Sequence, residues 1–264
     1  MKKRADELLV ERGLAPNRSK ARALIMAGQV RIGDQVIDKA GQPVGIDAAI
    51  EVEEGQRYVS RGGDKLEHAL MVFEVSPAGL ICADFGASTG GFTDVLLKAG
   101  AARVYAVDVG YGQLDYQLRT DDRVIVMERT NVRYLEGLPE LVDLVTVDVS
   151  FISLELIYPV VARVLKPGSG HCIALVKPQF EAGREQVRRG GVVRDPRVHR
   201  DVLLATVKHA RAAGLHPRHV AASPVLGPKG NREFLMLLDT APAESGTIES
   251  QIINVVRMTE GGEG

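Results

Sequence analysis

Two lysines and two carboxylic acids occupy positions where a solvated surface charge is not expected. Asp148 and Lys177 each end an apolar run, so both stand at the carboxyl ends of expected strands. Lys65 opens a helical segment, and Glu233 begins another apolar run. Each residue alone could be a charge at the end of an element that faces solvent. Because an amine beside a carboxylate can move a proton or hold a polar substrate, the four together are the first candidates for catalysis.

A glycine-rich turn in the stretch ICADFGASTGGFTDVLL, residues 81–97, leads from an apolar strand into an amphipathic helix. Its glycines allow a ligand to approach the backbone, and Ser88 or Thr89 could cap the helix. The turn lacks the G-x-G that a dinucleotide pyrophosphate requires. Asp84 precedes the first glycine and would repel a phosphate, but it suits the amino group and positive sulfonium of S-adenosylmethionine. The residues therefore favour S-adenosylmethionine, with a purely structural turn as the alternative.

Asp108 ends the next apolar run, 22 residues after Gly86. A carboxylate at this place commonly binds ribose hydroxyls. Both NAD and S-adenosylmethionine carry such a ribose, so Asp108 does not separate the two ligands. The expected cofactor site comprises Asp84, Gly86, Ser88, Gly90, Gly91 and Asp108.

The elements that must position these residues form an α/β fold of the Rossmann-like type. From residue 80 onward, near-continuous apolar runs alternate with helical segments, which is typical of a mostly parallel sheet covered on both faces. In such a sheet, ligands bind beyond the carboxyl ends of the strands, where most of the candidates lie. The last two runs have no room for a helix between them and should pair antiparallel. Seven strands are expected, within 80–86, 103–109, 124–129, 144–150, 170–177, 215–225 and 233–239.

The first 33 residues carry eight basic and three acidic side chains, although the whole chain has a formal net charge of −1. Apolar spacing predicts one helix over 4–12 and a second from the cap Asn17 to Gly28. Short β-like runs around Gly33 and Asp34 predict a hairpin. This small α+β module with a basic helix could bind nucleic acid, or its charges could simply solvate the surface.

The composition argues against several classes of protein. No apolar run reaches the roughly 20 residues that span a bilayer, and no cleavage site follows the basic start, so a cytoplasmic protein is expected. Cys82 and Cys172 each lie in an apolar run and should be inert core thiols. The six histidines show no metal-ligand spacing, and no metal is expected. The expected domains are a basic module at 1–56, a linker at 57–64, the α/β domain at 65–240 and a C-terminal tail at 241–264, whose extreme end should be loose.

The run RADELLVERGLAPNRSKARALIMAGQVRIGDQVI resembles an S4 RNA-binding domain, and the resemblance covers residues 3–52. It implies that four basic residues face RNA phosphates: Arg4, Arg18, Lys20 and Arg22. Phosphate contacts anchor a protein on RNA without reading its sequence, and they weaken as salt is added.

The rest of the chain resembles the FtsJ-like 2′-O-ribose methyltransferases, whose K-D-K-E tetrad falls on Lys65, Asp148, Lys177 and Glu233. Together with the S4-like module, several motifs resemble the TlyA family over residues 3–239: RYVSRGGDKL, DFGASTGGFTD, VDVGYGQL, VDVSFISL, LVKPQFE and GNREFL. The resemblance implies S-adenosylmethionine as cofactor and 2′-O-methylation of ribosomal RNA, at cytidine, with ribosomal RNA or a ribosomal subunit as partner. Members are often called hemolysins, a label that names an effect without a mechanism visible in the sequence.

The implied chemistry gives each member of the tetrad a role. A ribose 2′-hydroxyl is a weak nucleophile, and a lysine amine can take its proton only when neutral, whereas free lysine titrates near about 10.4. Our hypothesis makes Lys177 the base and Lys65 a neighbouring cation. Asp148 would orient Lys177 and favour the positive charge of the methyl donor. Glu233 would position Lys65 and the ribose.

The resemblance also implies that Phe92 lines the donor pocket and that Asn131 contacts the adenine. The segment 178–196 carries arginines among glycines, and we interpret it as an RNA-contacting loop, with a solvated loop as the alternative. Its arginines are Arg184, Arg188, Arg189 and Arg194.

Other classes of function remain open. A ribosome-assembly factor with a vestigial donor pocket would bind RNA without S-adenosylmethionine. A membrane-active hemolysin would need a feature such as an exposed amphipathic helix, which is not visible. An NAD-dependent oxidoreductase would share the fold, but the missing G-x-G argues against it.

Overall fold

The computed structural model describes residues 2–52, 57–183, 185–187, 190–242 and 248–260. The chain divides into two compact units, Met1–Arg57 and Tyr58–Gly264. Within the described ranges, no helix has both the length and the apolar character that crossing a membrane requires.

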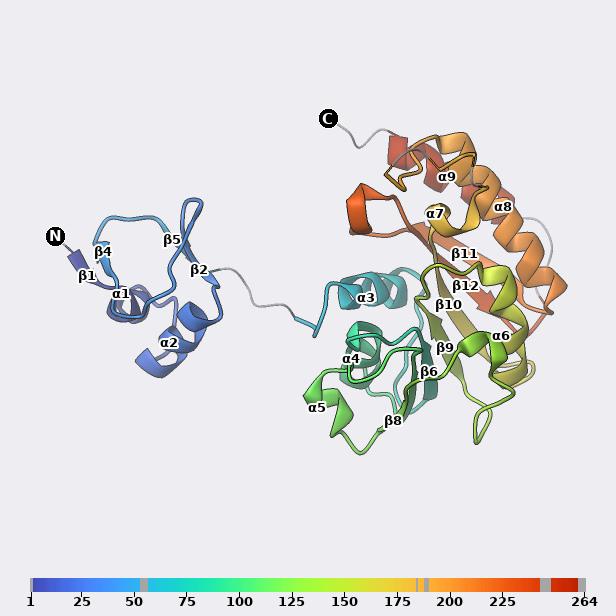
Figure 1. Cartoon of the computed structure of the whole chain (residues 1–264), viewed down its shortest axis with the longest axis horizontal. Coiled ribbons are helices and arrows are strands. Elements are labelled where there is room, and N and C mark those ends of the chain that lie inside the picture. Colours follow the sequence, from blue (N-terminus) through green and yellow to red (C-terminus); the bar gives the residue numbers. More distant parts are fainter. Residues whose placement is uncertain (1, 53–56, 184, 188–189, 243–247, 261–264) are drawn as a thin grey trace. The chain divides into compact units, whose positions relative to one another are not determined.

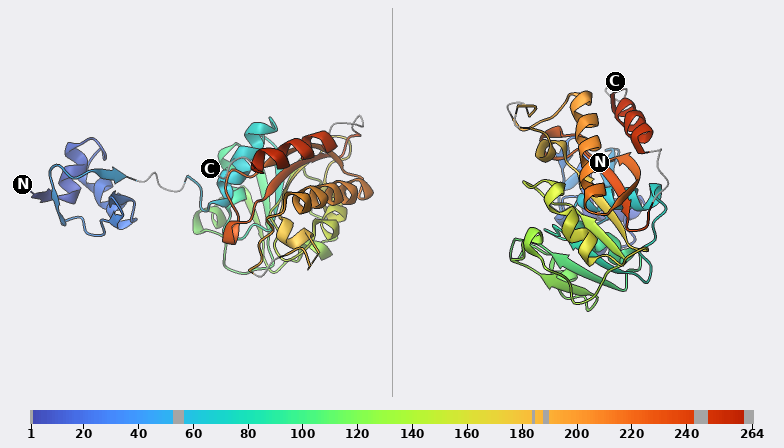
Figure 2. Two further views of the ribbon diagram at one scale, coloured as in Figure 1. Left: turned by 90° about the horizontal axis from the view of Figure 1, so that it is seen from above. Right: turned by 90° about the vertical axis from the view of Figure 1, so that its right-hand side faces the viewer.

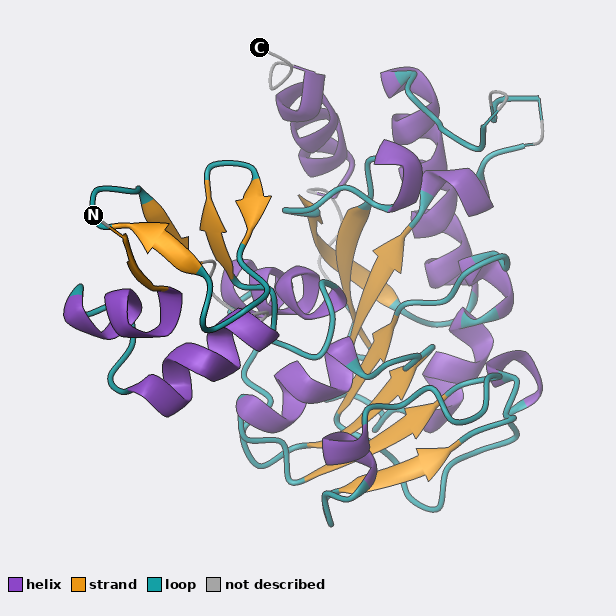
Figure 3. Cartoon of the chain, turned by 60° about the vertical axis from the view of Figure 1, so that its left-hand side comes forward, coloured by secondary structure: helices purple, strands orange, loops and turns teal. Residues whose placement is uncertain are grey.

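The N-terminal unit contains β1 (Lys2–Arg4), α1 (Ala5–Glu11), α2 (Arg18–Met26), β2 (Val30–Ile32), β3 (Gln35–Val36), β4 (Pro43–Gly45) and β5 (Ile50–Val52) (Figure 3). The Asn17 side chain caps α2 by accepting a hydrogen bond from the Lys20 amide. β2 and β3 pair antiparallel on either side of Gly33, as the hairpin signal predicts. The core between the helices and strands is apolar and includes Leu8, Leu9, Ala21, Ile25, Val30, Ile37 and Val44.

The second unit contains a sheet of strands β6 (Ile81–Phe85), β7 (Arg103–Val107), β8 (Val124–Met127), β9 (Leu144–Val147), β10 (His171–Val176), β11 (His216–Ala222) and β12 (Phe234–Asp239). These strands, all from the described residues, run in the order β11-β12-β10-β9-β6-β7-β8. The five from β10 to β8 pair in parallel, and β12 pairs antiparallel with both β10 and β11. The predicted mostly parallel α/β fold is confirmed, including the antiparallel last pair.

Helices cover both faces of this sheet (Figure 1). One face packs on α6 (Tyr158–Val164), α8 (Pro196–Ala212) and α9 (Ile248–Glu260). The other packs on α3 (Gly62–Val72), α4 (Gly91–Lys98) and α5 (Tyr116–Arg119). Both cysteines are free and buried in these cores, and burial raises the pKa of Cys82 to about 12.

The strand order creates a switch point at β6. The chain moves from β6 to β7 and β8 on one side, and β9 then returns to pair with the other side of β6. Neighbouring loops therefore leave β6 and β9 in opposite directions, which opens a crevice at their carboxyl ends. The glycine turn follows β6, and Asp148 follows β9.

The predicted linker at 57–64 is wrong from Tyr58 onward. The Val59 amide donates to Asp94 Oδ2 at 3.0 Å, and α3 begins already at Gly62. A Cβ on Gly63 would lie 2.4 Å from the Tyr58 side chain, so this glycine permits close packing instead of breaking the chain. Segment 58–64 is part of the second unit.

The prediction of a separate C-terminal tail at 241–264 is also wrong where the structure describes it, because this segment belongs to the second unit. Helix α9 is regular and packs against α8 and β11 (Figure 2). Ile248, Ile252 and Val256 are buried in the core, four residues apart on one face of the helix. Residues 243–247 and 261–264 lie outside the described residues.

Candidate active site

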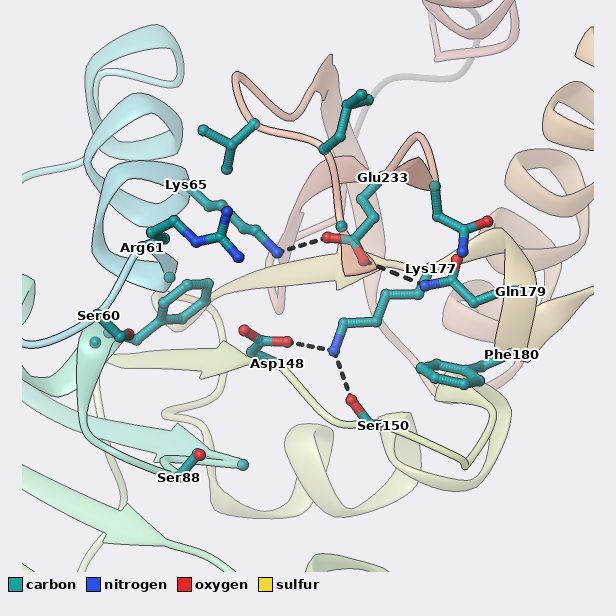
Figure 4. Close-up of a pocket in the computed structure, with 18 of the residues that line it drawn as sticks. Ser60, Arg61, Lys65, Ser88, Asp148, Ser150, Lys177, Gln179, Phe180 and Glu233 are labelled. Atoms are coloured by element: carbon teal, nitrogen blue, oxygen red, sulfur yellow. Dashed lines mark hydrogen bonds and ion pairs between the residues drawn. The ribbon is translucent and has the colours of Figure 1, made fainter. Parts of the chain in front are cut away.

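A cavity of about 720 Å³ opens at the carboxyl ends of β6, β9 and β10 (Figure 4). Its wall is built from segments that are far apart in sequence: 60–65, 86–92, 148–151, 177–180, 191 and 225–233. The structure brings all four predicted catalytic residues to this wall, namely Lys65, Asp148, Lys177 and Glu233. Its volume lies within the range of roughly 300–1,000 Å³ that is usual for ligand pockets.

Lys177 makes the first ion pair of the cavity. Its Nζ lies 2.6 Å from Asp148 Oδ1 and donates a hydrogen bond to Ser150 Oγ at 2.9 Å. Asp148 Oδ1 is buried and accepts no hydrogen bond of good geometry from the described residues, so the contact with Lys177 is mainly electrostatic. Lys177 stands directly before Pro178, the first residue of α7 (Pro178–Glu181), which fixes the backbone at this strand end. Asp148 is fixed by its own amide, which donates to the Phe85 carbonyl.

Lys65 makes the second ion pair, with Glu233. Lys65 Nζ lies 2.6 Å from Glu233 Oε2, and Gln179 Nε2 donates to the other carboxylate oxygen at 3.2 Å. Glu233 is fully buried and Lys65 is 9% exposed. A Cβ on Gly227 would lie 2.1 Å from Glu233 Oε1, so the carboxylate occupies space that any side chain at 227 would need. Each lysine thus has its own carboxylate. Lys65, the cation predicted to lie beside Lys177, has its charge neutralised by Glu233.

The glycine turn lies against the end of β9. The Gly86 and Ala87 amides donate to the Val107 carbonyl at 2.9 and 3.1 Å, which ties the turn to β7. A Cβ on Gly86 would lie 2.5 Å from the Asp148 carbonyl oxygen. Gly86 therefore lets the ends of β6 and β9 approach, and this approach places Asp148 beside the turn.

Gly90, with φ 97°, is the cap residue of α4, and no side chain caps this helix. The prediction that Ser88 or Thr89 would cap it is wrong. A Cβ on Gly91 would lie 2.2 Å from Ser60 Oγ, so this glycine serves the packing of segment 58–64. Among the predicted cofactor residues, those that line the cavity are Gly86, Ser88, Gly91 and Phe92.

Asp84 does not reach the cavity, which corrects its predicted contact with the cofactor. Its carboxylate is fully buried and accepts hydrogen bonds from Thr93 Oγ1 at 2.7 Å and Thr146 Oγ1 at 3.0 Å. Burial raises the pKa of Asp84 to about 7, against the opposing effect of the two hydroxyl donors. Through these hydrogen bonds Asp84 connects β6 to α4 and to β9, and so it stabilises the glycine turn that follows β6.

The raised pKa makes the stability of the fold depend on pH. Between about pH 4 and pH 7 the folded chain holds a proton on Asp84 that the unfolded chain has lost, so stability falls as pH rises through this window. The effect is at most about 4 kcal/mol. We expect Asp84→Asn to remove this part of the pH dependence in urea unfolding at pH 5 and pH 8. Equal pH dependence in the wild type and the variant would contradict the assignment.

Asp108 lines a separate small hollow that shares Ala87 and Ser88 with the cavity. Its carboxylate accepts hydrogen bonds from the amides of Ser88 at 2.8 Å and Gly110 at 2.6 Å. Leu114 and Val126 give this hollow an apolar wall. The hollow has a volume of only about 10 Å³, far less than a ribose and a base occupy.

Asn131 is exposed and lines neither the cavity nor the small hollow. Its side chain accepts a hydrogen bond from the Arg133 amide and caps η1 (Val132–Tyr134). The structure therefore does not place it for the predicted contact with adenine. Of the predicted arginine loop, Arg184, Arg188 and Arg189 lie outside the described residues, whereas Arg194 is exposed and the neighbouring Gly191 lines the cavity.

Several cavity residues were missed by reasoning from sequence. Arg61 adds a cation to the wall, and its signal was only its place next to a glycine pair. Phe151 is 90% exposed at φ 64°, with its ring centroid 4.9 Å from that of Phe180. Glu181 fixes the loop that carries Phe151 by accepting from Ser153 Oγ and the Leu154 amide at 2.7 and 2.9 Å.

The residues present fit S-adenosylmethionine. Asp148 offers a carboxylate to a positive sulfur, and Arg61 offers a cation to the carboxylate of the methionine part. Asp108, which is bound to the glycine turn through the Ser88 amide, offers a carboxylate to the ribose hydroxyls of the adenosine part. Among the described residues, no cluster of histidine, cysteine or acidic side chains could hold a metal ion.

In the N-terminal unit, three of the predicted RNA-binding residues meet at one carboxylate. Arg4, Arg18 and Arg22 each lie within 3.2 Å of a carboxylate oxygen of Asp6. Their side chains remain about half exposed, so pairing leaves them accessible. Lys20 is exposed near the start of α2.

The sequence matches two family profiles, the FtsJ-like methyltransferases over residues 58–240 and the S4 domain over residues 3–50. It is 52% identical to the "Putative rRNA methyltransferase YqxC" of Bacillus subtilis, over 90% of this chain and 85% of that protein. It is 47% identical to the "16S/23S rRNA (cytidine-2'-O)-methyltransferase TlyA" of Mycobacterium tuberculosis, over 90% of each chain. A solved "Putative hemolysin from Streptococcus thermophilus" is 43% identical and superposes with a TM-score of 0.76 over 98% of this chain and 96% of that chain.

These matches cover both units, and the sheet order with its switch-point cavity is the fold that they imply. The relatives also extend over nearly the whole chain, so the S4 module and the α/β unit match together. The chain therefore belongs to the TlyA family, an S4 domain joined in sequence to an FtsJ-like methyltransferase domain that uses S-adenosylmethionine.

Proposed function

We propose that this protein is a 2′-O-ribose methyltransferase that acts on cytidine in ribosomal RNA. The observation that carries the proposal is the convergence of the Lys177–Asp148 and Lys65–Glu233 pairs on one cavity beside the glycine turn. The printed name of the M. tuberculosis relative supports the RNA, the base and the position of the methyl group. The S4 match supports ribosomal RNA or a ribosomal subunit as the partner, which would place the protein in the cytoplasm.

In this proposal the amine of Lys177 acts on the 2′-hydroxyl of the target ribose. When bound, S-adenosylmethionine supplies a methyl group made electrophilic by a positively charged sulfur. Lys177 is paired with Asp148 as an ammonium, so Nζ must first release a proton to solvent. The neutral amine then holds the hydroxyl and takes its proton as the oxygen–methyl bond forms and the carbon–sulfur bond breaks. Asp148 and Ser150, at 2.6 and 2.9 Å, restrict the amine to one direction. Holding the hydroxyl in line with the methyl group contributes at least as much as proton transfer.

Lys65 and Glu233 shape the other side of the cavity. Because Glu233 is fully buried and bound by both Lys65 and Gln179, its carboxylate is held rigidly. Such a fixed pair can bind the ribose hydroxyls and keep the target nucleotide in register with Lys177.

The test is transfer of a labelled methyl group from S-adenosylmethionine to purified small and large ribosomal subunits and to the free RNAs. Ribose methylation is then mapped along each RNA with and without the protein. The expected result is a 2′-O-methyl group at a small number of cytidines. Methylation on a base, or at none of the riboses, would overturn the proposal.

Other functions predict different results in simple measurements. A ribosome-assembly factor with a vestigial site would bind subunits but give no heat with S-adenosylmethionine in calorimetry. A directly membrane-active protein would release dye from liposomes as a pure protein. Either result, together with the absence of methylation, would replace the proposed function.

Phe151 is expected to stack on a nucleobase of the RNA. A non-glycine residue held at φ 64° with a 90% exposed aromatic side chain is a strained arrangement, and such strain is typical of functional sites. Stacking of a base on an aromatic ring is worth about 1–3 kcal/mol. We expect Phe151→Ala to raise the KM for RNA about tenfold or more while the Kd for S-adenosylmethionine and the melting temperature stay unchanged.

Phe151→Tyr is the control for this prediction, because it keeps an aromatic face in the same place. Steady-state methylation with ribosomal subunits measures both variants. An unchanged KM for RNA in Phe151→Ala would show that the exposed ring does not contact the substrate.

A further inference from the structure

Asp6 is a fully buried carboxylate that collects three arginines in the N-terminal unit. It lies in the first turn of α1, where its amide donates to the Ala40 carbonyl. Arg4 binds it through two nitrogens, Nε to Oδ1 at 3.0 Å and Nη2 to Oδ2 at 3.2 Å. Arg18 Nη2 and Arg22 Nε, both from α2, approach Oδ2 at 3.2 and 3.1 Å.

The carboxylate of Asp6 is ionised in this setting. The guanidinium groups, Arg4 foremost, hold the pKa of Asp6 well below its usual range despite the opposing effect of burial. Three cations beside two anions, Asp6 and Glu7, leave an excess of positive charge at the surface. Without the anion, the three guanidinium groups would repel one another and turn separately into solvent.

The contacts with Asp6 leave much of each guanidinium available. Arg22 uses only Nε, and Arg18 uses only Nη2, which also lies 3.3 Å from Glu7 Oε1. The side chains of Arg4, Arg18 and Arg22 are 45%, 49% and 54% exposed. The remaining N–H groups can therefore form paired hydrogen bonds with phosphate oxygens, for which a guanidinium is suited.

We propose that Asp6 is a positioning residue that holds Arg4, Arg18 and Arg22 as one preordered set of phosphate-binding groups for RNA. This inference rests on the proposed function, since it assumes that the S4 domain binds RNA. The carboxylate itself is buried beneath the arginines and does not touch the RNA. It orders the three arginine side chains before binding, so that less conformational entropy is lost when the RNA binds.

Positioning and simple charge attraction predict opposite changes in the Kd for RNA when Asp6 is replaced by asparagine. Asp6→Asn removes a negative charge beneath a phosphate-binding surface, so attraction alone predicts tighter binding to RNA. Loss of preordering predicts weaker binding, by about tenfold, because three side chains must then be ordered by the RNA. The sign of the change in Kd therefore decides between the two.

Glu7→Gln is the matched control. Glu7 neighbours Asp6 on α1 and contacts Arg18 at 3.3 Å and Arg4 at 3.9 Å, but its side chain is 40% exposed. The substitution makes the same change in charge without removing the buried acceptor. We expect the Kd of Glu7→Gln for RNA to be equal to or lower than that of the wild type.

Gly41→Ala tests the same idea without any change in charge. A Cβ on Gly41 would lie 3.0 Å from Arg4 Nη1, and Gly41 is exposed with no positive φ. The new methyl group should displace the Arg4 guanidinium and weaken RNA binding about threefold, as expected for one side chain. This variant keeps the inference testable if Asp6→Asn fails to fold.

The experiment uses the full chain and purified ribosomal subunits, with filter binding from about 50 to 200 mM salt. Far-UV circular dichroism, the melting temperature and the Kd for S-adenosylmethionine establish that each variant is folded. Weaker binding by Asp6→Asn and Gly41→Ala, but not by Glu7→Gln, supports the inference. Tighter or unchanged binding by folded Asp6→Asn and Gly41→Ala overturns it.

Failure of the proposed function gives a different pattern. In that case the wild-type chain does not methylate the subunits, whether or not it binds them. If the wild type methylates normally and Asp6→Asn binds as well as the wild type, only the role of Asp6 is wrong.

Discussion

Lys177→Ala lowers the rate of methyl transfer by about 10²- to 10⁴-fold, whereas the Kd for S-adenosylmethionine changes little. The expectation follows from the place of the amine in the cavity. Lys177 Nζ is held by Asp148 at 2.6 Å and Ser150 at 2.9 Å, and the side chain is 10% exposed. The measurement is single-turnover methylation of ribosomal subunits, with donor binding followed by calorimetry.

Lys177→Arg separates proton transfer from positioning. Arginine keeps the positive charge and the hydrogen-bond donors, but it does not give up its proton in proteins. If Lys177 is the base, Lys177→Arg is as inactive as Lys177→Ala. A Lys177→Arg variant with a rate near that of the wild type would show that residue 177 only holds the substrate.

The fold of the catalytic unit could be predicted because its strands are buried on both faces. Runs such as 144–147 and 172–176 are apolar at all but one position, and that pattern is typical of a covered parallel sheet. The antiparallel pair β11–β12 followed from the short connection between two such runs. Helix α9 escaped prediction because only three of its positions are buried, and the many glycines and acids around it suggested a tail.

The catalytic tetrad could be located because each residue has an unusual place in an apolar pattern. The burial of individual polar residues and their hydrogen-bond partners could not be predicted in the same way. Asp84 looked like a ligand contact from its position before the glycine turn, yet Thr93 and Thr146 bind both of its oxygens. Thr93 reaches Asp84 from α4, and Thr146 reaches it from β9, which pairs with β6 across 62 residues, so sequence spacing reveals neither contact.

Asp6 is a second residue whose contacts could not be predicted from the sequence. In the sequence, Asp6 only lowers the positive charge of the first helix. In the structure it is the shared acceptor for residues 2, 12 and 16 positions away. Counting charges along a chain therefore misses which of them act together.

The pair Lys65–Glu233 is expected to be needed for both stability and activity. It joins residues 168 positions apart, with Glu233 fully buried and Lys65 9% exposed. Removing Lys65 leaves the buried Glu233 carboxylate with only the Gln179 amide among its hydrogen-bond partners in the described residues. Removing Glu233 leaves the Lys65 ammonium without this carboxylate. We therefore expect Lys65→Met and Glu233→Met each to lower the free energy of unfolding by about 3–5 kcal/mol.

The double variant Lys65→Met/Glu233→Met distinguishes a structural pair from a functional one. Buried ion pairs can often be replaced by apolar side chains without loss of stability, so the double variant should regain most of the stability that either single variant loses. It should remain about 10²-fold or more below the wild type in methyl transfer, because no apolar pair can hold a ribose hydroxyl in line. Urea unfolding and single-turnover methylation measure the two properties separately. A stable and fully active double variant would mean that the pair only supports the fold, and that Lys177 and Asp148 act without it.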